Sequence, residues 1–490
     1  MNKFAPLKFT EWSTVDLNYS VLLPEIILSL TGITIMLVIP FVSKDRQVSL
    51  GYPALVGIGL AVLGLLMEWN ETGMAFFEMV FQDPFSQFCK MLFLFATAAI
   101  VLMTMHYLSQ EDVAEGEFFS LLLFATVGMF LMAASADLIM TFLGLEVLSI
   151  STYVLAGFKE QERRSNESAI KYFLLGAFST AFLLYGIAFV YGATGSTKYL
   201  AIAEAIRTSE SEPLILLLGL GLMVVGFGFK VALVPFHVWA PDVYEGAPLP
   251  VTAHLAVGSK AAAMVALVRI LYQVFPELGP EWQVLLWMSA VLTMAIGNIA
   301  ALTQTNIKRM LAYSSIAHTG YLLLGLTSHN KLGTQGILYY LVAYALMTLG
   351  AFTIVQIVGH RNEQYIQIED YRGLGYRCPF LGITLSIFLI SLAGIPATAG
   401  FMGKFFLFAA ALQSEMYGLV VVALIASAIG LYYYLRVIVL MYMGEYHEKE
   451  TLITIPISLQ VVIAIMVLGT LYLGIFPGTF LHLASEAVSF

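Results

Sequence analysis

The sequence predicts an all-α membrane protein that crosses the bilayer about 14 times. The first observation is composition, because 59% of the 490 residues are hydrophobic and only 11% are charged, against about 25% charged in a soluble protein. The second is that apolar stretches of about 20 residues, long enough to span the hydrocarbon core, recur along the whole chain. The third is that these stretches lack the alternation of a transmembrane β-barrel.

The spans follow one another with short polar connections, and the least certain boundary lies near Ala134–Asp137, where Asp137 is suited to cap a helix. We expect helices one to three within 1–117, a first five-helix unit in 118–272, a second in 283–443, and helix fourteen in 444–490. The expected spans are 21–42, 50–68, 85–107, 118–134, 137–157, 170–192, 213–238, 248–272, 283–303, 308–327, 334–358, 379–414, 416–443 and 452–480.

Basic residues indicate the orientation, because short loops rich in Lys and Arg stay in the cytoplasm. With the expected count of spans, the basic loops all fall on one side, and both termini then lie in the periplasm. The residues concerned are Lys44, Arg46, Lys159, Arg163, Arg164, Lys308, Arg309, Arg361, Arg372 and Arg377.

Two parts of the sequence resemble each other and indicate an internal repeat. SISTYVLAG at 149–157 resembles SIAHTGYLLLG at 315–325. Each part also has a lysine near a proline: Lys230 precedes Pro235, and Lys404 follows Pro396. Proline removes a backbone hydrogen bond from a helix, so we expect a break at both places. A unit with an odd number of spans must return inverted, and inverted repeats with broken helices are common in transporters.

Four charged residues lie deep inside apolar segments: Glu146, Lys230, Lys260 and Lys404. Such charges persist mainly where they face a protein interior or a water path, so they predict a route for protons or ions. Lys260 lies near the middle of its span, among small residues, where a lysine can lose its charge by desolvation. Alternatives are that Lys230 reaches the interface, that Glu146 forms a structural ion pair, and that Lys404 ends a helix.

Glu146 is expected to act on a lysine as a mobile electrostatic partner, and the spacing leaves open whether that lysine is Lys230 or Lys260. His237, His254 and His318 lie in or near spans and either relay protons or join helices by hydrogen bonds.

Other positions favour ordinary roles. Arg269 and Arg436 lie near span ends, where the side chain is expected to extend to the interface. The chain has no Walker loop, no HExxH pair and no basic patch with aromatic residues, which disfavours nucleotide chemistry, a zinc site and nucleic-acid binding. Its two cysteines match no iron–sulfur or haem spacing.

Three long segments carry a resemblance to a known family. FKVALVPFHVWAPDVYEGAPLPVTAHLAVGSKAAA (229–263), IKRMLAYSSIAHTGYLLLG (307–325) and GIPATAGFMGKFFLF (394–408) resemble the antiporter-like membrane subunits of bacterial respiratory complex I, NADH:quinone oxidoreductase. Within that family the chain is most similar to the N-type subunit, because that type carries a lysine at Lys404. The resemblance covers nearly the whole chain.

The resemblance implies fourteen helices with helices 7 and 12 broken, and a bacterial inner-membrane location. It implies proton translocation coupled to quinone reduction, through Glu146, Lys230, Lys260, His318 and Lys404. It implies partners among the other antiporter-like and small membrane subunits, with membrane lipid around them. No cofactor is expected on this chain, because NADH, FMN, iron–sulfur clusters and quinone belong to other subunits.

Two other functions remain open from the sequence. A subunit of a multisubunit sodium/proton antiporter would share the fold and much of the motif. A scaffold that only anchors its neighbours would use the same charges as structural ion pairs.

Overall fold

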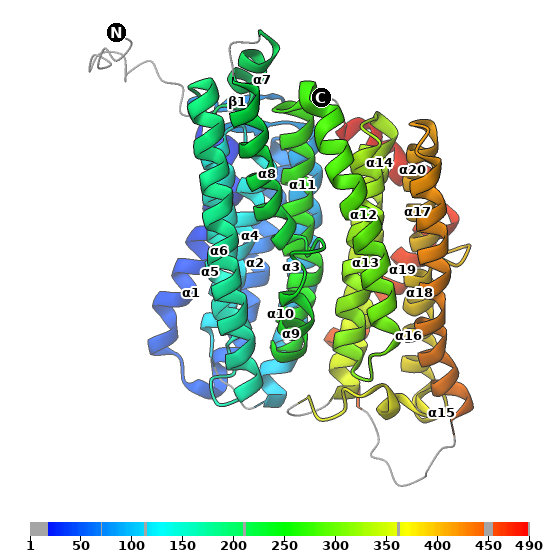
Figure 1. Cartoon of the computed structure of the whole chain (residues 1–490). Helices are drawn as coiled ribbons and strands as arrows, with labels where there is room; N and C mark the ends of the chain where they lie inside the picture. Colours follow the sequence, from blue (N-terminus) through cyan, green and yellow to red (C-terminus); the bar gives the residue numbers. More distant parts are fainter. Residues whose placement is uncertain are drawn as a thin grey trace.

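A computed structural model describes residues 18–69, 71–111, 115–208, 212–359, 363–444 and 454–488. The helices stand side by side in one bundle (Figure 1). Twelve helical segments in these ranges are long and apolar enough to cross a membrane. The prediction of an all-α polytopic membrane protein is therefore confirmed. Arg361 and both chain ends lie outside the described residues.

The first half of the bundle contains helices that coincide with the first eight predicted spans. Its elements are α1 (Leu23–Val38), α2 (Gly51–Met67), α3 (Pro84–Glu111), α4 (Glu117–Ala134), α5 (Leu138–Ala156), α6 (Arg163–Thr194), α7 (Tyr199–Arg207), α8 (Pro213–Lys230), α9 (Trp239–Gly246), α10 (Leu249–His254) and α11 (Lys260–Gln273).

The second half of the bundle contains the helices of the later predicted spans. Its elements are α12 (Gly279–Leu302), α13 (Ile307–Thr327), α14 (Lys331–Gly359), α15 (Leu374–Arg377), α16 (Pro379–Ala393), α17 (Ala399–Gln413), α18 (Tyr417–Met443), α19 (Ile457–Ile475) and α20 (Pro477–Ala487).

Two predicted spans are interrupted. The helix of the seventh, α8, ends at Lys230, and the chain becomes helical again in α9 just beyond the predicted end at 238; the twelfth divides into α16 and α17 around its proline-containing stretch. The eighth span contains a feature that was not predicted, a π-helical turn at Leu255–Ser259 between α10 and α11. Such turns occur frequently at functional sites because they shift the side chains that follow them.

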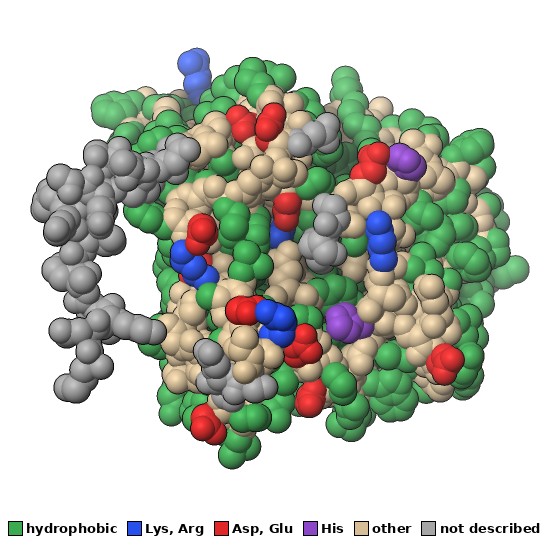
Figure 2. All heavy atoms as spheres, turned by 90° about the horizontal axis from the view of Figure 1, so that it is seen from above, with side chains coloured by type: hydrophobic (Ala, Val, Ile, Leu, Met, Phe, Trp, Pro, Cys, Tyr) green, Lys and Arg blue, Asp and Glu red, His purple; other side chains and the backbone are tan. Residues whose placement is uncertain are grey.

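The two ends of the bundle differ. A short hairpin of β1 (Gly73–Ala75) and β2 (Val80–Gln82) lies at one end with α7 and α20, and none of these elements was predicted (Figure 1). We call this end the hairpin face and the opposite end, which carries α15, the α15 face. Figure 2 shows charged side chains gathered across the middle of the hairpin face, with hydrophobic side chains around them.

The predicted loop after span five is partly helical. Arg163 and Arg164 were expected in the loop after span five, but they form the first turn of α6, which begins seven residues before the predicted window. A polar turn extends the helix beyond its apolar part, and hydropathy alone does not detect such an extension.

Burial increases toward the middle of the bundle. Every residue of α14 from Ile337 to Gly359 is buried, whereas α6, α12 and α18 expose large hydrophobic side chains such as Phe178, Met288 and Leu424. Gly128 and Gly144 let α4 and α5 approach closely, since a Cβ on Gly128 would lie 2.5 Å from the backbone of α5. The helices that carry the predicted site residues thus lie inside or against a tightly packed core.

Candidate functional site

Lys230 is the last residue of α8, and its side chain is 3% exposed. Its ammonium group donates hydrogen bonds to the hydroxyl of Ser149, at 3.0 Å, and to that of Tyr172, at 2.9 Å. It also lies over the Tyr172 ring, 5.1 Å from the centroid. The lysine therefore points into the bundle and does not reach the interface.

The break after Lys230 is stabilised by hydroxyl groups from other helices. Thr319 donates to the carbonyl of Val231 at 2.8 Å, and Thr293 accepts from the amide of Val234 at 3.0 Å. Trp239 donates its indole N–H to the carbonyl of Phe229 at 2.8 Å. Irregular backbone at membrane depth requires such partners, so α12 and α13 of the second half hold the broken helix of the first.

Glu146 lies on α5 and is only partly buried. Its carboxylate accepts a hydrogen bond from Thr180 of α6 at 2.9 Å. Among the described residues it forms no ion pair with Lys230 or Lys260. Ser149, three residues further on the same helix, contacts Lys230 instead. A direct ion pair is thus absent among the described residues, and the electrostatic action of Glu146 on Lys230 or Lys260 stays a prediction.

Lys260 follows the π-helical turn and is 2% exposed. Its ammonium group donates to the backbone carbonyl of Ser315 at 2.9 Å and to the hydroxyl of the same residue. Both hydrogen bonds of Lys260 thus go to neutral oxygens of one residue of the second half.

The space between Lys230 and Lys260 carries further polar groups. Tyr172, which binds Lys230, lies close to Ser259, the residue before Lys260. Both ring nitrogens of His254 are buried and have no hydrogen-bond partner among the described residues. Buried groups of this kind usually bind ordered water. His237, in contrast, is half-buried and lies within the break between α8 and α9.

His318 lies on α13, one turn beyond Ser315, and is 2% exposed. One ring nitrogen is hydrogen-bonded to the hydroxyl of Tyr340, and the other lies 3.1 Å from the hydroxyl of Tyr434. Tyr434 is also hydrogen-bonded to Ser314. The imidazole therefore has a hydroxyl partner on each side, an arrangement suited to passing a proton.

Lys404 lies on α17 and is 5% exposed. It donates to the carbonyls of Leu392, at 3.2 Å, and Ala393, at 3.0 Å, which end α16, and to the Ser427 hydroxyl at 3.0 Å. A cation is stabilised at a helix C-terminus because the last carbonyls lack helical partners. Pro396 itself is exposed within the break.

Gly394 permits this contact. Its φ is +85°, and a Cβ there would lie 3.0 Å from the Lys404 side chain. A larger residue would therefore be strained and would displace the lysine.

Several buried charges outside the predicted site are paired with carboxylates. Lys90 contacts Glu25 at 2.6 Å, with both side chains 5% exposed. Arg269 was expected to extend to the interface, which is wrong: its side chain is fully buried and contacts Asp83 at 2.8 Å. The Asp83 carboxylate compensates the buried charge of Arg269. Because Asp83 is far from Arg269 in the sequence, the sequence alone does not reveal this pair.

The sequence relatives identify the family. A sequence model described as "NADH:quinone oxidoreductase/Mrp antiporter, TM" matches residues 135–430. NADH-quinone oxidoreductase subunit N of Trichlorobacter lovleyi is 46% identical over 97% of this chain and 98% of its own length. The chain belongs to the subunit N family of NADH-quinone oxidoreductase.

Solved structures agree with this family. A chain of respiratory complex I from Thermus thermophilus is 34% identical, with a TM-score of 0.81 over 94% of this chain and 99% of that one. A chain of the Mrp complex from Dietzia sp. has a TM-score of 0.83 over 96% of this chain and 97% of that one, at 19% identity, and shows a shared fold.

As a member of the subunit N family, the chain is a proton-translocating, antiporter-like membrane subunit of a complex I-type enzyme. It assembles with other antiporter-like and membrane subunits of that complex.

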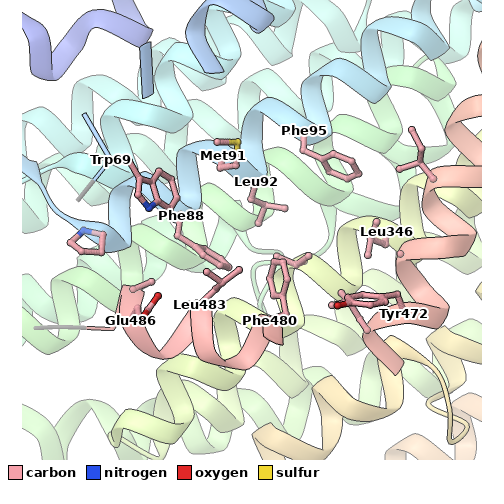
Figure 3. Close-up of a pocket in the computed structure, with 16 residues that line it drawn as sticks. Trp69, Phe88, Met91, Leu92, Phe95, Leu346, Tyr472, Phe480, Leu483 and Glu486 are labelled. Atoms are coloured by element: carbon pink, nitrogen blue, oxygen red, sulfur yellow. The ribbon is translucent and has the colours of Figure 1, made fainter. Parts of the chain in front are cut away.

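One well-formed apolar cavity has none of the buried lysines in its lining. It has a volume of about 530 Å³ and lies between α3, α14, α19 and α20 (Figure 3). Trp69, Phe88, Leu92 and Phe480 are among its apolar lining residues, and Glu486 is the one charged side chain. Such a lining offers no set of donors for the phosphates of a nucleotide or flavin. The described residues also contain no cluster of three or more His, Cys, Asp or Glu side chains suited to a metal.

Proposed function

We propose that protons cross this subunit through Lys230, Lys260, His318 and Lys404, with Glu146 as the electrostatic switch. Lys230 takes up a proton from the α15 face, Lys260 receives it, His318 passes it within the second half, and Lys404 releases it toward the hairpin face. His254 supports the step between the first two lysines, and His237 lies beside the broken helix.

One observation supports this proposal above all: three of the buried lysines lack a carboxylate. The described part of the chain contains six buried lysines. Lys90, Lys159 and Lys308 each contact a carboxylate at 2.9 Å or less. Lys230, Lys260 and Lys404 donate hydrogen bonds only to hydroxyls and carbonyls among the described residues.

A buried ammonium without a counter-charge is costly unless it can give up its proton. Lysines that only join helices would be paired like the first three. The unpaired lysines therefore favour proton carriers over the scaffold alternative.

The hydroxyl groups support a route between the carriers. Ser149 and Tyr172 contact Lys230, Ser315 contacts Lys260, and tyrosines contact both sides of His318. A hydroxyl both donates and accepts, so it can pass a proton that an apolar side chain would stop. Neutral oxygen and nitrogen atoms thus extend from the break in α8–α9 to the break in α16–α17.

We also propose that residues 118–272 and 283–443 form two inverted five-helix repeats. Each unit contains one broken helix and one lysine at the break, Lys230 or Lys404. The repeats would give two half-channels of opposite direction, joined through Lys260 and His318.

For the setting in the cell, we propose the inner membrane of a bacterium, with the α15 face in the cytoplasm and both termini in the periplasm. The basic residues of the short loops support this orientation. NADH, FMN, iron–sulfur clusters and quinone would then be bound by other subunits, and this chain would supply the proton path.

Sodium/proton exchange is less well supported. Sodium is a hard cation that requires several oxygen ligands, and the unpaired groups on the path are ammonium groups that repel it. The likeness to the Mrp complex concerns the fold, at 19% identity.

The test is the variant Lys260→Ala in the assembled complex, reconstituted into vesicles. We expect fewer protons pumped per NADH oxidised, with the complex still assembled. The matched control is Lys331→Ala, because Lys331 is exposed at the start of α14. A wild-type ratio of protons to NADH in the assembled Lys260→Ala complex would refute the role of Lys260.

A further inference from the structure

The turn between α9 and α10 joins the two parts of the chain that carry Lys230 and Lys260. α9 ends at Gly246 and α10 begins at Leu249, so only Ala247 and Pro248 lie between them. Ala247 and Leu249 are each 1% exposed. A shift of this turn would move the start of the helix that leads to Lys260.

Two side chains of the second half contact this turn on both of its sides. Lys308, in the first turn of α13, donates to the carbonyl of Ala247 at 2.7 Å. Glu363, which follows α14, accepts from the amide of Leu249 at 3.0 Å. The first amides of a helix have no helical acceptor, and a carboxylate there is favourable.

The two side chains also contact each other. The Lys308 ammonium lies 2.6 Å from the Glu363 carboxylate, and their side chains are 0% and 12% exposed. Each group is therefore compensated by the other, and removal of one would leave a buried charge.

The Glu363 carboxylate also accepts a hydrogen bond from α3, one of the N-terminal helices. Tyr107 of α3 donates to Glu363 at 3.0 Å. Lys159 lies over the Tyr107 ring at 5.3 Å and contacts Glu111 at 2.7 Å. Glu363 thus contacts α3, the α9–α10 turn and α13 at the same time.

The face of α13 that holds the turn also holds Lys260. Ser315, the acceptor for Lys260, lies seven residues after Lys308, which is two helical turns or about 10 Å along the same face. One side of α13 therefore contacts both ends of the segment from Ala247 to Lys260.

We infer that Lys308 and Glu363 form a clamp between the two halves, a pair of positioning residues that sets Lys260 against Ser315. This inference rests on the proposed role of Lys260 in proton transfer. The clamp would keep the Lys260–Ser315 contact in register while the broken helix beside Lys230 moves.

The test is Glu363→Gln in the intact complex, with two measurements. Hydrogen exchange of the amides between Leu249 and Lys260 reports the position of the segment, and we expect it to become about tenfold faster. The number of protons pumped per NADH reports function, and we expect it to fall in the assembled complex. The control is Glu369→Gln, which breaks an exposed pair with Arg372 at 2.6 Å in the same region and is expected to change neither value.

Unchanged exchange in Glu363→Gln would overturn the clamp. Faster exchange with a wild-type pumping ratio would also overturn it, because the contact would then only support the fold. Lys308→Arg keeps the charge and should preserve both values.

If Glu363→Gln does not assemble, Tyr107→Phe removes a single contact to the carboxylate. Tyr107→Phe should then accelerate hydrogen exchange of the same amides by less than the roughly tenfold change expected for Glu363→Gln. Unchanged exchange in Tyr107→Phe would contradict the inference. The exchange measurement remains decisive even if Lys260→Ala pumps normally, so the two proposals fail separately.

Discussion

The buried pair of Arg269 and Asp83 makes a prediction about the hairpin-face end of α11. Arg269 donates to both carboxylate oxygens of Asp83, at 2.8 and 2.9 Å, and its side chain is fully buried. The centroids of the Phe81 and Phe85 rings each lie 4.9 Å from the guanidinium carbon. Asp83→Asn keeps the shape of the side chain and removes its charge.

The size of the effect follows from this geometry. Two unit charges 2.8 Å apart attract by about 6 kcal/mol at an effective dielectric constant of about 20. The Asp83 side chain is one-fifth exposed, so water compensates part of the attraction that is lost in Asp83→Asn. Loss of one partner from a buried pair typically costs about 3–5 kcal/mol, and we expect a free energy of unfolding lower by that amount.

The assay is denaturant or thermal unfolding of the purified complex, followed for this subunit. The matched control is Glu204→Gln, because the Glu204–Arg207 pair is more than half exposed and should contribute less than about 1 kcal/mol. A loss below about 1 kcal/mol in Asp83→Asn would refute the reasoning, since it would mean that Arg269 is solvated or paired elsewhere.

The pH dependence gives a second check. Burial alone would raise the pKa of Asp83, but the Arg269 charge and the hydrogen bonds from Arg269 and Ser86 outweigh it and hold that pKa below its ordinary value. A carboxyl with a lowered pKa stabilises the fold above its unfolded pKa, about 3.9, and loses this contribution as the pH falls through the folded pKa. The difference between wild type and Asp83→Asn should therefore stay constant from about pH 5 to 8.

Two further predictions concern the proton path. Thr180→Val removes the hydroxyl that holds Glu146, a charge-assisted hydrogen bond of about 1.5–3 kcal/mol; pumping by the assembled complex should slow, and an unchanged rate would show that the position of Glu146 is unimportant. Lys404→Met removes the donor of the Leu392 carbonyl, whereas Ser427 still donates to the carbonyl of Ala393 at 3.4 Å; it should cost about 1–3 kcal/mol of stability for the buried carbonyl left unpaired, together with reduced pumping. Lys404→Arg is its control, because it keeps the charge and should retain most of the stability.

The sequence predicts the helices and the unusual lysines for clear physical reasons. Apolar runs of membrane length leave few alternatives to a helix, and Lys260 is conspicuous because no other charge lies near it in the sequence. Asp137 was expected to cap a helix, and it accepts from the amide of Ile139 at 2.7 Å at the start of α5. Each of these features depends on neighbours close in sequence.

Contacts between distant residues could not be predicted in this way. Ser315 contacts Lys260 across 55 residues and Glu363 contacts Tyr107 across 256, and serines and tyrosines are common in apolar spans. The burial of Arg269 depends on Asp83, 186 residues earlier. The π-helical turn before Lys260 has no sequence signal of its own, because packing against the surrounding helices decides it.

The stretch of α11 between Lys260 and Arg269 has an electrical consequence. Residues 261–268 are all apolar and all buried, and they extend for about 12 Å. A transmembrane voltage falls mainly across regions without water or mobile charge, so this plug insulates Lys260 from the hairpin face. Moving one elementary charge against 100 mV requires about 2.3 kcal/mol. On the proposed route, most of the work against the voltage would therefore be needed after Lys260, on the passage through His318 to Lys404.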